Sequence, residues 1–175
     1  MSLSKIVFSN TYTYSDFYRR FYLLKEFIEN FIYKGNENEG SIMDSLEKFF
    51  SEKEISYENK EAMKEWGESF FSELINSGNV YKVFDQIEED FKKAPLFMLQ
   101  VPVKFSEKDV FMFGKWFREN INEKAFITVN VDPDISAGCL FSWKSNQYDM
   151  SFNRLYKDKH REISKRIKEV VNENS

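Results

Sequence analysis

The sequence has few of the residues that build metal and redox sites, with one cysteine and one histidine among 175 residues. A single cysteine cannot form a disulfide within the chain, and these two residues cannot supply the ligand set of a Cys/His zinc site. The six glycines are scattered and form no phosphate-binding loop. We therefore expect a reducing compartment and no catalytic, cofactor-binding or metal-binding residues.

Long apolar runs are also missing. No stretch approaches the roughly 20 apolar residues of a transmembrane helix. The opening MSLSKIVFSN has neither the basic start nor the apolar core of a secretory signal. We therefore expect a cytoplasmic protein without direct membrane insertion.

The chain is rich in apolar and aromatic residues. Hydrophobic residues make up 42% and aromatic residues 18%, including 19 phenylalanines. Such a chain can bury a core in one ordinary domain or two small ones. The formal net charge of −4 argues against a surface built to coat nucleic acid.

Helical spacing of apolar residues predicts four helices in the first half, at residues 15–33, 41–52, 57–76 and 80–92. The polar segment 34–40 contains two glycines and predicts the first loop. None of these helices is stable alone in water, so we expect them to pack as a small antiparallel bundle.

Near Ala94 and Pro95 the pattern changes to short apolar runs typical of strands. The run at 96–101 predicts a largely buried strand, since both of its alternating faces are apolar. Ser106, followed three residues later by Asp109, predicts a helix N-cap. The later elements are predicted as a helix at 106–120, strands at 125–131, 138–144 and 148–152, a hairpin turn at 144–147, and a helix at 153–171.

This order predicts an α+β protein with two domains. An N-terminal antiparallel helical bundle at residues 1–93 is followed by a small α/β domain at residues 94–175, with the order β-α-β-β-β-α.

The last helix differs in charge from the rest of the chain. Residues 151–175 hold seven Lys/Arg and four Asp/Glu, a net of +3 that leaves −7 on the other residues. One interpretation is a solvated outer face of an ordinary terminal helix. The other is a docking face for an acidic partner, with Arg154, Lys157, Arg161 and Lys165 as candidate contacts.

The two residues with the most reactive side chains have ordinary explanations. His160 lies in a charged run and is expected to be a solvated helix residue, and Cys139 begins an apolar strand as an inert thiol. Acidic clusters such as Glu88-Glu89-Asp90 fit solvated helix faces better than an acid–base pair.

The second half carries an ordered set of short motifs. Ser106 starts a helix, and Asp132-Pro133 can form the turn that ends a strand. Small residues at Ala137-Gly138 allow close backbone approach. Further motif positions are Asp149, Ser151 as a candidate N-cap, and Leu155 in an Arg-Leu step.

In this order, the motifs resemble the C-terminal domain of the delta subunit of F-type ATP synthases, called OSCP in mitochondria. The segment 70–91 resembles the last bundle helices of that family, so the resemblance covers roughly residues 60–165. The Ala-rich opening of the family is absent, and residues 1–40 are aromatic instead. Asp-Met-Ser stands at 149–151 where the family has Asp-Gly-Ser.

The resemblance implies a non-catalytic stator subunit that links the catalytic head to the peripheral stalk and resists rotor torque. The implied partners are the N-termini of the alpha subunits for the bundle and the C-termini of the b-subunit stalk for the second domain. The chain would act as a monomer in a complex peripherally associated with the inner membrane, without nucleic acid. The alternative is an unrelated adaptor or nucleic-acid-binding module that uses the basic last helix.

Overall fold

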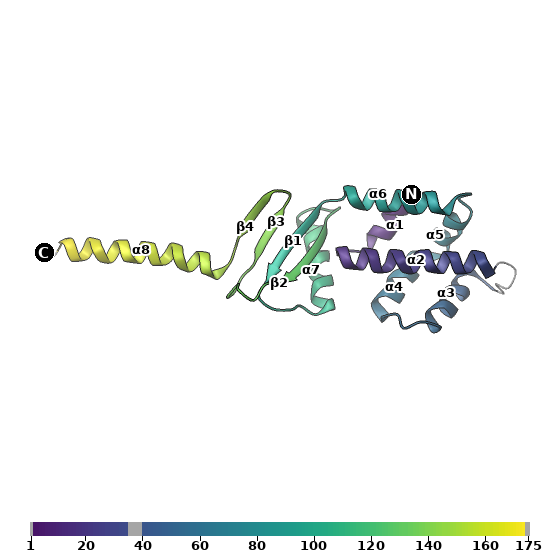
Figure 1. The fold of residues 1–175 in the computed structure, drawn as a ribbon, viewed down its shortest axis with the longest axis horizontal. Helices are drawn as coiled ribbons and strands as arrows, with labels where there is room; N and C mark the ends of the chain where they lie inside the picture. The colour runs from purple at the N-terminus through teal and green to yellow at the C-terminus, as the bar shows by residue number, and fades with distance from the viewer. Residues whose placement is uncertain (1, 35–39, 174–175) are drawn as a thin grey trace. The chain divides into compact units, whose positions relative to one another are not determined.

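The computed structural model describes residues 2–34 and 40–173. A helical N-terminal region precedes a small four-stranded sheet and further helices (Figure 1), which confirms the predicted α+β class. The loop predicted at 34–40 lies outside the described residues except at its two ends. No helix in the described ranges is long and apolar enough to cross a membrane.

Residue contacts divide the chain into two compact units. The first unit comprises Met1–Pro95 and Gly114–Phe126, and the second comprises Leu96–Phe113 and Ile127–Ser175. The sequence pattern placed residues 114–126 in the second domain, whereas the contacts group them with the first unit. The assignment of domains at 1–93 and 94–175 stays a prediction.

Within the described residues, the helical region contains six helices, labelled in Figure 1: α1 (Leu3–Ser9), α2 (Tyr14–Lys34), α3 (Ile42–Ser51), α4 (Tyr57–Glu65), α5 (Gly67–Ile75) and α6 (Val80–Lys93). The prediction of one helix at 57–76 is wrong, because the path breaks at Gly67. This residue has a φ of +78°, a left-handed conformation that glycine adopts readily. The short helix α1 was not predicted.

Side-chain caps set the start of α3 and α6. Ser41 precedes α3, where its hydroxyl accepts from the Asp44 N–H at 3.1 Å and the Asp44 carboxylate accepts from the Ser41 N–H at 2.9 Å. This capping box satisfies backbone donors that a helix start leaves unpaired. Asn79 caps α6 by accepting from the Lys82 N–H at 3.1 Å.

Phenylalanine dominates the core of the first unit. Phe17 and Phe91 stack with ring centroids 3.7 Å apart, and Phe126 meets Phe91 edge-on at 4.7 Å. Val7 of α1 is fully buried in the same cluster. The largest fully buried side chains are Phe17, Phe21, Phe27, Phe50, Phe70, Phe71, Phe84 and Phe126.

A buried polar network joins the turn after α1 to α2 and α4. The Arg20 side chain is 2% exposed and donates to the Asn10 carbonyl at 2.6 Å and to Asn59 Oδ1 at 3.0 Å. The Asn10 amide donates onward to the Ala62 carbonyl at 2.8 Å. Trp66 Nε1 donates to Asn10 Oδ1 at 3.2 Å. The network therefore satisfies polar groups that water does not reach.

The remaining elements are β1 (Leu96–Val101), α7 (Glu107–Asn120), β2 (Phe126–Val131), β3 (Leu140–Trp143), β4 (Asn146–Asp149) and α8 (Phe152–Glu173). The strand order is β2-β1-β3-β4, and β3 is antiparallel to both β1 and β4. Phe97 pairs with Trp143 across β1 and β3, and their rings stack at 5.2 Å.

Two details of the predicted strands are wrong. Strand β1 alternates between exposed and buried residues rather than being largely buried, with Leu96 and Met98 at 40% and 41% exposure. Strand β4 covers Asn146–Asp149 and not residues 148–152, because Trp143 pairs with Asn146 across a turn of only two residues. Lys144 begins that turn with a φ of 56°.

Candidate interaction surfaces

The motif residues near α7 and β2 serve local backbone geometry. Ser106 caps α7 by accepting from the Asp109 N–H at 3.2 Å. Asp132 Oδ1 accepts from the Asp134 N–H at 3.0 Å, and the Asp132 carbonyl accepts from the Ile135 N–H at 3.2 Å. Pro133 lies within this turn, where its fixed φ suits the bend.

The segment from Ala137 to Cys139 lies against the start of α8. The Met150 N–H donates to the Cys139 carbonyl at 2.9 Å, and the Phe152 N–H donates to the Ala137 carbonyl at 2.8 Å. Between these bonds, Gly138 has a φ of +85°, and a Cβ there would lie 2.4 Å from the Met150 carbonyl oxygen. Only glycine fits this approach, so the position is structural.

Asp149 and Ser151 complete the base of α8. Asp149 Oδ1 accepts from the Ser151 N–H at 2.8 Å, and Ser151 takes the N-cap position with the Arg154 N–H 3.4 Å from its hydroxyl. Arg154 also donates from Nη1 to the Asp149 carbonyl at 3.3 Å. Together with the bonds to residues 137–139, these contacts fix the first turn of α8 to the second unit.

The pKa of Asp149 predicts an acid-sensitive contribution to this anchor. Hydrogen bonding by the Ser151 side chain, followed by its backbone N–H, lowers the pKa of Asp149 from the ordinary 3.8. The resulting stabilisation is present above that ordinary pKa and is lost as the pH falls through the lower folded value. The difference in unfolding midpoint between wild type and Asp149→Asn should therefore shrink from pH 7 to pH 3. An NMR titration of the Asp149 carboxyl with an ordinary midpoint would contradict this.

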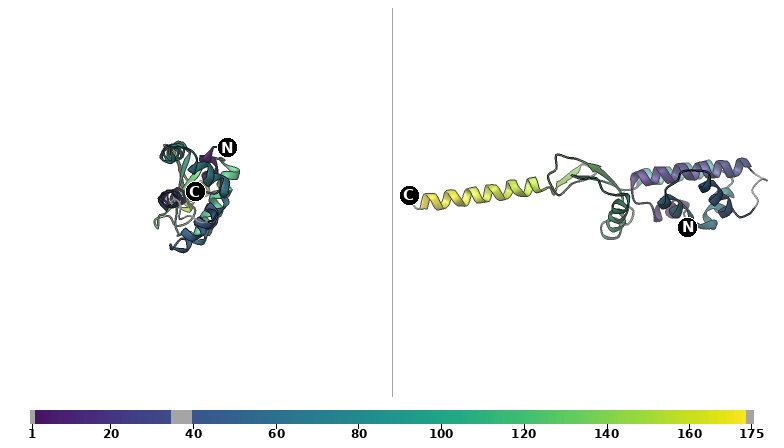
Figure 2. Two further views of the ribbon diagram at one scale, coloured as in Figure 1. Left: turned by 90° about the vertical axis from the view of Figure 1, so that its right-hand side faces the viewer. Right: turned by 90° about the horizontal axis from the view of Figure 1, so that it is seen from below.

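Helix α8 displays six large apolar residues, each more than half exposed, which we call the apolar stripe. Successive residues of an α-helix turn by about 100°, so the six side chains point into a sector of roughly 120°. Helix α8 continues as one unbroken helix beyond β4 (Figure 2). The stripe residues are Phe152 (55% exposed), Leu155 (59%), Tyr156 (58%), Ile163 (55%), Ile167 (58%) and Val170 (57%).

The candidate contacts Arg154, Lys157, Arg161 and Lys165 share one face, together with Lys168. We call these five residues the basic stripe. It lies on the side of α8 opposite the apolar stripe, by the same rotation of about 100° per residue. Lys165 is 3.9 Å from Glu169, an exposed pair of the kind that adds little stability.

Three tyrosines form a row along one side of α2, with Tyr14 and Tyr22 exposed and Tyr18 half-buried against the core. The rings of Tyr14 and Tyr18 are 4.8 Å apart, and those of Tyr18 and Tyr22 are 6.3 Å apart. The hydrogen bond with Tyr14, followed by burial and nearby charge including Glu88, raises the pKa of Tyr18 to about 12. The row is an aromatic surface with hydroxyl groups, a composition frequent at protein interfaces.

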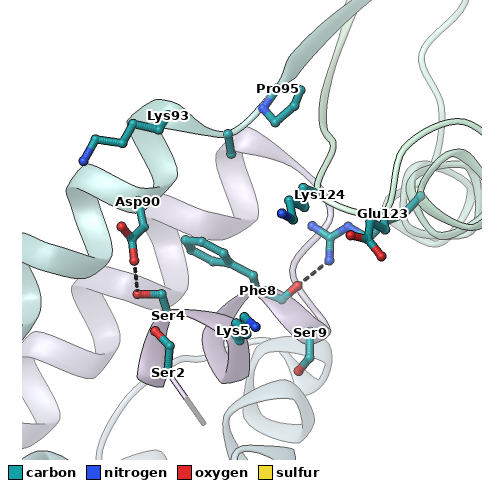
Figure 3. Close-up of a pocket in the computed structure, with 12 residues that line it drawn as sticks. Ser2, Ser4, Lys5, Phe8, Ser9, Asp90, Lys93, Pro95, Glu123 and Lys124 are labelled. Carbon is teal, nitrogen blue, oxygen red and sulfur yellow. Dashed lines mark hydrogen bonds between the residues drawn. The ribbon is translucent and has the colours of Figure 1, made fainter.

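A cavity of about 590 Å³ lies beside α1 and the end of α6 (Figure 3). Its polar groups are held by the chain itself: Ser4 Oγ donates to Asp90 Oδ2 at 2.6 Å. The Arg118 guanidinium donates to the Phe8 and Thr11 carbonyls. Three lysines and Arg118 line it together with Asp90 and Glu123, so it carries both signs of charge.

In the described ranges, neither Cys139 nor His160 forms part of a catalytic arrangement. Cys139 is half-buried, and burial raises the pKa of its thiol, which lowers its reactivity. His160 Nδ1 and Ser164 Oγ lie 3.5 Å apart on the exposed surface of α8. No group of three or more His, Cys, Asp or Glu residues in the described part of the chain could hold a metal ion.

The apolar stripe and the buried Arg20 network were both missed in the sequence. The stripe could have been found, because its members recur at three- and four-residue spacing in a predicted helix. Arg20 gave no local signal, since Asn59 lies 39 residues away.

Neither a model of a known protein family nor a curated protein matches the sequence of this chain.

Proposed function

We propose that this chain is a non-catalytic stator subunit of an F-type proton-translocating ATP synthase, of the delta or OSCP type. Its N-terminal bundle, residues 1–93, binds N-terminal segments of the alpha subunits. Its C-terminal domain, residues 94–175, binds the end of the b-subunit peripheral stalk. The protein acts as a monomer within the complex, on the cytoplasmic side of the inner membrane, and resists the torque of the rotor.

The observation that carries this proposal is the exposed apolar stripe on α8. A helix in water normally turns its apolar side chains toward a core. Here six of them are more than half exposed along a helix that begins at Phe152. A group of exposed apolar side chains of this size marks a protein interaction site. The proposed role is therefore one of binding and mechanical linkage.

Two further features support the stator assignment. The second half has the order β1-α7-β2-β3-β4-α8, which is the order that the resemblance implies. Gly138 and Asp149 lie in the anchor of α8, at positions that the family motif occupies. A firm base suits a protein that transmits force, because a loosely attached arm would absorb it.

For binding to the alpha subunits, the tyrosine row on α2 is the best supported surface of the first unit. Tyr14 and Tyr22 are 42% and 64% exposed. Their rings offer apolar area and their hydroxyl groups offer hydrogen bonds, which fits an amphipathic helical segment as the occupant.

Co-purification tests the proposed function. A tagged full-length chain isolated from detergent-solubilised native membranes should carry the alpha, beta and b subunits with it. Deleting its gene should lower proton-driven ATP synthesis while ATP hydrolysis by the released head continues, because an unanchored head turns with the rotor. A complete synthase that purifies without this chain would refute the proposal. Salt-dependent binding to RNA or DNA would favour the adaptor alternative.

A further inference from the structure

The apolar stripe of α8 requires a partner for energetic reasons. Every described side chain of α8 is exposed except Ser151 at its cap, which is buried, and Ser164, which is half-buried. Most of the stability of a helix in a protein comes from packing of its amphipathic face. Exposure of six large apolar side chains to water raises the free energy of the unbound helix, because the burial of each side chain would be favourable. Covering the stripe therefore stabilises the helix and hides the apolar surface at once.

The sector of the apolar stripe also contains two cations. With about 100° of rotation per residue, Lys159 and Arg166 lie between Leu155 and Phe152 within the sector, and His160 lies just beyond Ile167 at its other side. The Arg166 guanidinium is 3.3 Å from Glu162, an exposed pair one turn away. A partner helix on the stripe would therefore meet Lys159 and Arg166 together with the apolar side chains.

We infer that the apolar stripe, and not the basic stripe, is the docking face of α8. Its partner is an amphipathic helix of another protein that has acidic residues opposite Lys159 and Arg166. The basic stripe faces away from that helix. This inference rests on the proposed function where it identifies the partner with the stalk, but the face and the chemistry of the partner follow from α8 alone.

Charge disfavours pairing of α8 with the α8 of a second copy of the chain. Residues 151–175 carry a net charge of +3, so two copies of α8 would repel each other. In a parallel pair, Lys159 and Arg166 would also lie at the same level of both helices. An acidic helix reverses both effects, because Lys159 and Arg166 then gain opposite charges.

The anchored base of α8 favours binding. The bonds from Met150 and Phe152 to residues 137–139 hold the first turn before a partner arrives. Less conformational freedom is then lost on association, and preorganisation of this kind raises affinity.

A titration separates the two faces. The probe is a synthetic peptide of the C-terminal helix of the b stalk from the same source, titrated against the full-length chain by fluorescence anisotropy. Ile163→Asp should weaken binding by roughly 30-fold or more, since it places a charge in a buried contact. Arg161→Gln, on the basic stripe, should change affinity by less than about threefold. Lys159→Gln should weaken binding by about two- to fivefold, and only at low salt.

Ser164→Asp is the matched control, because it introduces the same side chain next to Ile163 but off the stripe. It should leave affinity within about threefold of wild type, and circular dichroism should give equal helicity for the two Asp variants. A larger loss with Arg161→Gln than with Ile163→Asp would overturn the inference. So would a wild-type dimer in analytical ultracentrifugation that Ile163→Asp dissociates.

A photo-crosslinking experiment separates failure of the inference from failure of the proposed function. Benzoylphenylalanine is placed at position 163 or 161 of the full chain in its native cells. Crosslinks from 163 to an acidic amphipathic helix, and few from 161, support the inference. If that helix belongs to a protein outside the synthase, the docking face stands and the stator function fails. Equal crosslinking from both positions, or none from 163, overturns the docking face.

Discussion

Replacing Arg20 with methionine is expected to lower the free energy of unfolding by roughly 3 kcal/mol. The Arg20 guanidinium is buried and donates to the Asn10 carbonyl at 2.6 Å, Thr11 Oγ1 at 3.2 Å and Asn59 Oδ1 at 3.0 Å. Methionine has a similar length but no donor, so these acceptors would stay buried with fewer hydrogen bonds. Burial lowers the pKa of Arg20, because desolvation disfavours the charged guanidinium and the nearby Asp16 and Glu65 offset this only in part.

Arg19→Met is the matched control for this effect. It changes the same residue type one position away, where the side chain is less buried, and should alter stability by less than about 0.5 kcal/mol. Arg20→Lys should recover only part of the loss, since an ammonium cannot reproduce the planar guanidinium fork. Guanidinium-induced unfolding followed by circular dichroism measures all three variants. A loss below about 1 kcal/mol for Arg20→Met would mean that the network is solvated in solution.

Most helices could be predicted from the sequence, whereas the hydrogen-bond partners of Arg20 could not. Helices α2, α3, α6 and α8 were predicted within a few residues of their observed ends, because an amphipathic period is a local property. The break at Gly67 was missed, since one glycine inside a helical pattern is tolerated at a cost of about 1 kcal/mol and does not by itself end the helix. The partners of Arg20 come from residues far along the chain, which no local pattern specifies.

The candidate surfaces on α8 show the same difference between what a local sequence pattern specifies and what depends on tertiary contacts. A count of charges selected Arg154, Lys157, Arg161 and Lys165, and these residues do share a face of α8. A count of charges does not say on which face of a helix each side chain lies, so it did not reveal that the apolar side chains lie on the opposite face. Whether Phe152 or Ile163 packs inside the chain or stays exposed depends on tertiary contacts. The exposure of the apolar stripe could therefore be established only from the structure.

The anchor of α8 depends on a backbone approach that a single methyl group would block. Gly138→Ala should lower the free energy of unfolding of the second unit by roughly 3 kcal/mol. Its Cβ would lie 2.4 Å from the Met150 carbonyl oxygen and 3.0 Å from Ser151 Cα. Both are backbone atoms, so no rotamer change relieves the contact. The chain must separate at this point, which lengthens the bonds from Met150 and Phe152 to residues 137–139.

Gly78→Ala separates the steric effect from the effect of backbone conformation. Gly78 has a similar φ of +74°, but a Cβ there would meet nothing within 4 Å. It should therefore show only the left-handed penalty, about 1 kcal/mol. Hydrogen exchange gives the local readout, because the amides of Met150 and Phe152 should exchange faster in Gly138→Ala and at the wild-type rate in Gly78→Ala. Equal losses of stability in both variants would contradict the close approach, and α8 would then lack the firm base that the proposed stator function requires.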